Sequence, residues 1–362
     1  MGNIWSDVGE KQQAIVCYEE ALEIKQQLYG TDNADTAEIM FNIAILKMQQ
    51  GYYLDALPLM ERASNLFAQH LPAQHFYQQQ AQTLEQILQN TIMLPDAIGA
   101  RDWIRVKEYY ENLFTLVPNH ASYYHNFACY LHIEANEQQS LNKQESIRLL
   151  TQAETYFKRA ISLAEKASTL VEFGQFLFMR NRYVEALPLL QNALKKKDDG
   201  SILSYNEVET NILFVPLRTA IEKAFFVSQT ATAMTVRPSI LAHVLIVAIY
   251  EDCQSSDKST MQKRHIQLLH EEAYQSPNPI YYELLVYACK LVNCPLLAHK
   301  HQQRSNSLWH GKQPVPEKKQ IEWKEHFDRG DHYKLLTTAQ SFWQHKVRTR
   351  HQGLVQSQAE LS

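Results

Sequence analysis

Histidine and cysteine are the residues of this chain whose number first suggests chemistry. The 362 residues include 15 histidines and 5 cysteines. No close histidine spacing forms the HExxH zinc motif; the pairs are His120 with His125, His265 with His270, and His299 with His301. No CxxC pair occurs among Cys17, Cys129, Cys253, Cys289 and Cys294. These spacings predict no metal site and no cofactor, so we expect a chelator to leave the melting temperature unchanged.

The remaining motifs of enzymes and nucleic-acid binders are also absent from the sequence. The chain lacks GxxxxGK[ST], GxGxxG and GxSxG, so the sequence predicts no enzyme, with an unrecognised site in residues 199–362 as the alternative. Lysine and arginine number 35 against 39 aspartates and glutamates, a net charge of −4. A near balance argues against bulk nucleic-acid binding, which needs a basic surface.

A repeat at a fixed offset organises the N-terminal part of the chain. Gly9 corresponds to Gly51 and Ala14 to Ala56, both 42 residues apart. Periods of this size are typical of stacked supersecondary units that bury their apolar faces against one another. With 10 glycines and 12 prolines in the chain, helices are favoured over a turn-rich β protein.

The repeated positions resemble the tetratricopeptide repeat (TPR), a helix–turn–helix unit. The small and large apolar residues that carry the resemblance are Ala44, Ala56, Met60 and Ala63; then Ala128, Ala153, Phe157 and Ala160; then Gly174, Ala186, Leu190 and Ala193. The 42-residue spacing and the polar linker 28–37 resemble the kinesin-light-chain subtype. The resemblance implies an all-α fold, a right-handed α-solenoid of TPR helix pairs.

The resemblance also divides the chain. Residues 1–198 form the TPR array, with a truncated first repeat because Gly2 already occupies a mid-helix position, so we expect residues 1–8 to fray. An insertion near 133–147 is expected, with 134–144 as a polar loop. Residues 199–308 are predicted as degenerate helical repeats. Within them, 201–250 is predicted to be apolar and helical, with helix starts or breaks at Val215-Pro216 and Arg237-Pro238. Residues 309–362 are predicted as a helical extension and tail, disordered from residue 350.

Site residues follow from the concave groove that the first helices of TPR units line. Counting from each small residue gives the predicted peptide- or partner-binding positions Glu38, Phe41, Asn42, Ile45, His125, Asn126, Cys129, Glu172 and Gln175. Asn42 and Asn126 each stand two residues before a small residue, like the asparagine that holds a ligand backbone in the family. An amide both donates and accepts, which suits a peptide bond.

The sequence therefore predicts an adaptor or scaffold with a protein or peptide partner and no nucleic acid. The alternative within the same class is a regulatory protein that senses a peptide. The N-terminus has no signal-peptide pattern, and the most apolar run, 240–250, is too short to cross a bilayer. Together with the scattered cysteines, this predicts a cytoplasmic protein without an integral membrane segment, while the oligomeric state is left open.

Overall fold

The computed structural model describes residues 10–196, 199–205, 209–228, 233–252 and 257–309. The expected fraying of residues 1–8 and the expected tail beyond residue 309 lie outside this part of the chain. The chain divides into two compact units, Met1–Phe127 and Ala128–Ser362. The division falls inside one continuous helix, and it differs from the predicted end of the TPR array at residue 198.

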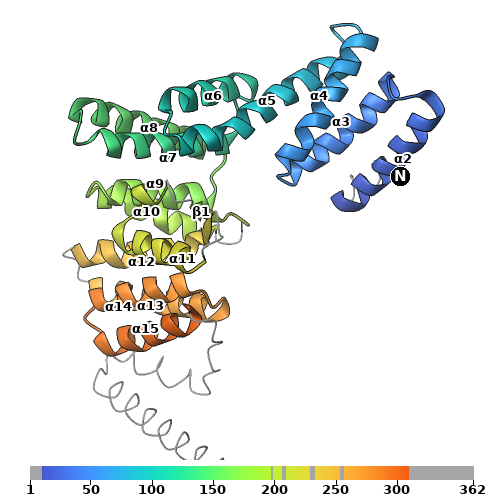
Figure 1. Cartoon of the computed structure of the whole chain (residues 1–362). Helices are drawn as coiled ribbons and strands as arrows, with labels where there is room; N and C mark the ends of the chain where they lie inside the picture. Colours follow the sequence, from blue (N-terminus) through green and yellow to red (C-terminus); the bar gives the residue numbers. More distant parts are fainter. Residues whose placement is uncertain (1–9, 197–198, 206–208, 229–232, 253–256, 310–362) are drawn as a thin grey trace, which may run out of the picture. The chain divides into compact units, whose positions relative to one another are not determined.

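The first unit is a run of helices in which each packs against its neighbours in sequence (Figure 1). Its elements are α2 (Lys11–Tyr29), α3 (Ala34–Gln49), α4 (Tyr53–His70), α5 (Phe76–Gly99), α6 (Trp103–Leu116) and the first turns of α7 (Ala121–Gln138). Successive packing of this kind is the arrangement of an α-solenoid.

The second unit continues with helix pairs and one small β-ladder. Its elements are α8 (Lys143–Leu163), α9 (Ala167–Phe178), α10 (Tyr183–Lys195), β1 (Leu203–Tyr205), the 3₁₀-helix η1 (Glu209–Ile212), α11 (Val215–Ser228), β2 (Met234–Val236), α12 (Pro238–Asp252), α13 (Lys258–Gln275), α14 (Pro279–Leu291) and α15 (Pro295–Trp309). The predicted all-α solenoid is confirmed. Helices α11 and α12 begin at the two predicted positions, Val215 and Pro238. The helical prediction for 201–250 is wrong at Leu203–Tyr205 and Met234–Val236, which pair as antiparallel strands.

The same turn closes four of the helix pairs. In each turn, the residue before the second helix donates its backbone N–H to the carbonyl five residues earlier; the bonds are Tyr52 to Lys47, Asp102 to Ala97, Arg182 to Leu177, and Cys294 to Cys289. This is a Schellman bond, and it needs a left-handed residue just ahead of the donor. That residue is Gly51, Arg101, Asn181 or Asn293, with φ of 84°, 55°, 58° and 55°. The pair α14–α15 is therefore built like the N-terminal pairs.

Small residues lie where the two helices of a pair come closest. Ala44 of α3 and Ala56 and Ala63 of α4 are completely buried. Between α9 and α10, a Cβ placed on Gly174 would stand 2.7 Å from Cδ2 and 2.9 Å from Cγ of Leu190. The helices of this pair therefore approach until no side chain fits between them at that position.

The predicted loop over 134–144 is wrong for most of its length. Helix α7 continues to Gln138 and α8 begins at Lys143. Ile133 and Ala135 are completely buried, so the apolar side of α7 extends into the segment that looked polar. The side chain of Asn142 accepts a hydrogen bond from the backbone N–H of Glu145 and caps α8. The additional residues thus lengthen two helices, and the loop between them is short.

Buried histidines fill the core of the C-terminal helices. His243 of α12 and His265 of α13 are both buried, with their Nδ1 atoms 2.8 Å apart. Burial lowers the pKa of His265 to about 4, and the nearby Arg264 guanidinium contributes in the same direction. Burial likewise holds the pKa of His301 well below its ordinary value, with His270, Lys300 and Arg304 adding to the effect. The folded chain therefore keeps the imidazoles of His265 and His301 neutral at pH 7.

We expect Gly174→Ala to lower the free energy of unfolding by about 1–2 kcal/mol, because overpacking against Leu190 outweighs the helix propensity gained. Urea denaturation followed by circular dichroism measures the change. The control is Gly99→Ala, since Gly99 ends α5 with no atom within 4 Å of the added Cβ. Equal stabilities for the two variants would contradict the close approach.

Acid should weaken the fold through His265. The unfolded chain takes up a proton near the ordinary pKa of about 6.5, whereas the folded chain resists until about 4, so stability falls as the pH drops through that window. The full effect for this one group is about 3 kcal/mol at pH 4. Denaturation curves between pH 7 and pH 4 should show a smaller acid loss for His265→Gln, while His120→Gln, at an exposed site, keeps the wild-type loss. An unchanged loss in His265→Gln would exclude this group as a source.

Candidate functional site

One exposed stripe runs along helix α3. Its residues are spaced three or four apart, so they lie on one face of the helix; they are Asp35, Glu38, Asn42, Ile45 and Gln49. All five are exposed or half-buried, whereas Ala37, Met40 and Ala44 of the same helix are buried. We call these five residues the α3 stripe. It contains three of the predicted binding residues, Glu38, Asn42 and Ile45.

Neighbouring helices hold the carboxylates of the α3 stripe. Lys25 of α2 lies with its Nζ 2.5 Å from Oδ2 of Asp35, and this hydrogen bond raises the pKa of Lys25. Tyr77 of α5 donates its hydroxyl to Oε1 of Glu38 at 3.0 Å, and burial together with this carboxylate raises the pKa of Tyr77. Within the described part of the chain, the Asn42 amide has no hydrogen-bond partner. Its donor and acceptor are available to another molecule.

Phe41 was predicted to line the groove, and the structure places it in the core. Its side chain is buried, with its ring 6.0 Å from that of Phe67 and 5.7 Å from that of Tyr77, both edge to face. Ile45 packs against the same cluster while staying half-buried. Phe41 is therefore part of the core against which helix α3 packs.

Asn126 repeats the arrangement of Asn42 on helix α7. It stands two residues before the buried Ala128, as Asn42 stands two residues before the buried Ala44. Asn126 is exposed, and among the described residues its amide has no hydrogen-bond partner. The two asparagines thus share a position in their repeats and an unengaged amide.

The corresponding face of α9 is covered by the chain itself. The Asp199 carboxylate accepts from the Ala167 backbone N–H at 2.7 Å, at the first turn of α9. One turn before the end of the helix, Gln175 donates its amide to the carbonyl oxygen of Ile212 at 3.4 Å. Glu172 and Gln175, both predicted to meet a partner, are buried in consequence. Asp199 and Ile212 thus contact the face that the resemblance assigned to a ligand.

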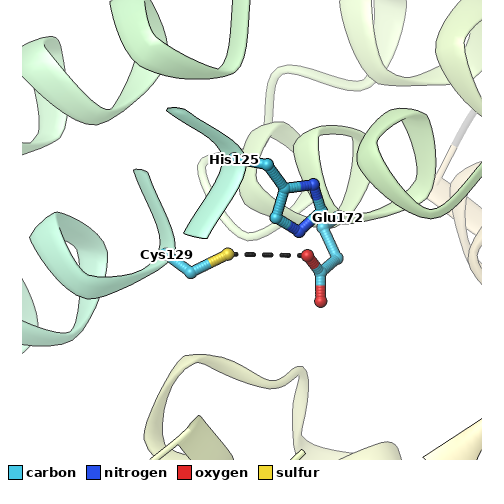
Figure 2. A group of neighbouring side chains, drawn as sticks. All are labelled: His125, Cys129 and Glu172. Carbon is cyan, nitrogen blue, oxygen red and sulfur yellow. Dashed lines mark hydrogen bonds between the residues drawn. The ribbon is translucent and has the colours of Figure 1, made fainter. Parts of the chain in front are cut away.

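Three predicted partner-binding residues meet in one polar cluster (Figure 2). His125 and Cys129 lie one turn apart on α7, and Glu172 comes from α9. The Cys129 thiol donates to Oε2 of Glu172 at 3.5 Å. One donor atom from each of the three side chains lies within 4.8 Å of the other two. His125 is half-buried, whereas Cys129 and Glu172 are buried. We call these residues the α7–α9 cluster.

Burial and negative charge dominate the electrostatics of the α7–α9 cluster. Burial raises the pKa of the Cys129 thiol well above its ordinary value, and the Glu172 and Glu209 carboxylates raise it further. The buried phenol of Tyr205, on β1, also has its pKa raised well above normal, first by burial and then by Glu172 and Cys129. Both groups are therefore neutral at pH 7, and the thiol is a weak nucleophile.

The cluster could not be found from histidine spacing alone. The informative spacing is that of His125 with Cys129, which stand four residues apart and are not a histidine pair. Two residues four apart share a helix face, so this spacing was a readable signal. Glu172 lies 43 residues after Cys129, and only the packing of α9 against α7 brings it near.

A family model of the tetratricopeptide repeat matches residues 3–69. No curated protein sequence matches the chain. Among solved structures, a tetratricopeptide repeat protein from Parabacteroides merdae is 11% identical, with 91% of this chain and 94% of that chain covered and a TM-score of 0.38. The human IFIT1 dimer with PPP-AAAA is 12% identical, with coverage of 82% and 69% and a TM-score of 0.36. The P58(IPK) TPR domain is 11% identical, with coverage of 94% and 97% and a TM-score of 0.26. The kinesin-light-chain subtype stays a prediction.

The described part of the chain holds four free thiols of unequal exposure. Cys17 is half-buried, and Cys129, Cys289 and Cys294 are buried. Burial raises the pKa of Cys289 as it does that of Cys129.

We expect iodoacetamide to modify Cys17 faster than Cys129 or Cys289 in the native chain, by about tenfold or more. Peptide mapping by mass spectrometry at successive times measures the rates. Equal rates for Cys17 and Cys129 would contradict the burial of the cluster.

Proposed function

We propose that this chain is a protein-interaction scaffold that binds an extended peptide segment along its inner helices, at Asn42 of the α3 stripe and at Asn126 of α7. The observation that supports this most is the pair of unengaged amides at equivalent repeat positions. A helical repeat array of the tetratricopeptide type is an interaction scaffold in general. We propose in particular that the partner binds the face that carries Asn42 and Asn126.

The chemistry of the α3 stripe indicates what the peptide would present. The Asn42 amide donates to a backbone carbonyl and accepts from a backbone N–H, which fixes a strand without reading its side chains. Ile45, one turn further along, offers an apolar contact. Glu38 and Asp35 place carboxylates at the other end, where a basic side chain of the peptide would be favoured.

A cytoplasmic location and a protein partner are part of this proposal. The described cysteines are all free thiols, which suits a reducing compartment. The near balance of 35 basic and 39 acidic residues favours a peptide over a nucleic acid. No described helix is both long enough and apolar enough to cross a membrane.

The double variant Asn42→Ala with Asn126→Ala should bind a partner peptide about tenfold or more weakly, because each lost amide leaves a backbone group of the ligand unpaired. Peptides selected from a displayed random library against the full chain serve as probes, and fluorescence anisotropy measures their affinity. The melting temperature should barely change, since neither side chain lies in the core.

The matched control is Asn65→Ala, which removes an exposed asparagine from α4, the second helix of the same pair. Its affinity should equal that of the wild type. A folded double variant with wild-type affinity would exclude this face as the binding surface, and an equal loss in Asn65→Ala would mean that the peptides recognise α4.

A further inference from the structure

We propose that the α7–α9 cluster, His125, Cys129 and Glu172, is a binding site for a divalent transition metal ion of the Zn²⁺ type. Nothing in the proposed scaffold role requires such a site, and it differs from the expectation that the spacings of histidines and cysteines gave.

The donors come from two helices, α7 and α9. His125 and Cys129 are four residues apart on one continuous helix, so their side chains project from the same face of α7. Paired ligands at this spacing are a recurrent way for a helix to hold zinc, as in HExxH. Glu172 closes the set from α9, the inner helix of the following pair.

The separations are near those of a coordinated ion. With Zn–S of about 2.3 Å and Zn–N and Zn–O of about 2.0 Å, ligand atoms around a tetrahedral ion stand about 3.3–3.6 Å apart. The Cys129 sulfur and the Glu172 oxygen are 3.5 Å apart already. All three donor atoms lie within 4.8 Å of one another, so only a small contraction is needed. His125 is the half-buried member of the three.

The chemical types of the three donor atoms favour some metal ions over others. A thiolate, an imidazole and a carboxylate suit Zn²⁺, whereas Mg²⁺ and Ca²⁺ prefer oxygen ligands alone. Three protein ligands leave a fourth position for water. Among the described residues, no other trio of histidine, cysteine, aspartate or glutamate donors comes this close together.

Binding of a divalent ion would leave the deprotonated site electrically neutral. On binding, the Cys129 thiol loses its proton to solvent, the sulfur–hydrogen bond is replaced by a sulfur–metal bond, and no electron is transferred. The thiolate and the Glu172 carboxylate then carry two negative charges, which a divalent ion neutralises. Because both side chains are buried, a neutral set is far less costly than two uncompensated anions.

Cobalt binding to the thiol-reduced, metal-stripped full chain tests the site. One equivalent of Co²⁺ should produce thiolate-to-cobalt charge-transfer absorption, and Zn²⁺ should displace it. Cys129→Ser should abolish that absorption, and His125→Asn and Glu172→Gln should each weaken Co²⁺ binding by about tenfold or more. Circular dichroism establishes that each variant is folded.

The matched controls are Cys17→Ser, at a half-buried thiol of α2, and His120→Asn, at an exposed histidine just before α7. Both should bind Co²⁺ with the wild-type spectrum and affinity. Absence of a charge-transfer band in the wild type would overturn the proposal, as would a band that survives Cys129→Ser. If Cys129→Ser fails to fold, wild-type binding in both His125→Asn and Glu172→Gln would overturn it.

Discussion

The close approach of paired helices is the constraint on which the rest of this structure depends. At Gly174 the space that a Cβ would need is already filled by Leu190, and Ala44 and Ala56 are completely buried in the pair α3–α4. Close packing requires a short connection with one left-handed residue, which explains why the same Schellman turn recurs at Gly51, Arg101, Asn181 and Asn293. The four turns share the same hydrogen bond and the same left-handed backbone, although the residue at the left-handed position differs.

Such packing leaves each inner helix with one face that its partner helix does not cover, and the chain uses these faces differently. On α3 the face stays accessible, with carboxylates tied to Lys25 and Tyr77 and an unengaged amide at Asn42. On α9 the chain's own Asp199 and Ile212 contact this face. The first arrangement suits an external peptide, and the second creates a buried polar environment.

Buried polar groups therefore gather in the second unit, where they need internal partners. Glu283 of α14 accepts hydrogen bonds from Lys223, Ser305 and Trp309. Burial opposes ionisation of Glu283, yet these donors leave its pKa below the ordinary value. The α7–α9 cluster differs because its members include a thiol and a carboxylate that face each other.

The sequence by itself determined the helical repeats and their contact positions, because small residues at fixed spacing allow close helix approach wherever they occur. It also placed the starts of α11 and α12 near Val215 and Pro238, since proline restricts the residue before it. Tertiary structure alone decided that Asp199 and Ile212 contact α9, that β1 pairs with β2, and that Glu172 joins His125 and Cys129. Those contacts join residues far apart in the chain, and periodicity reports only which residues share a face of one helix.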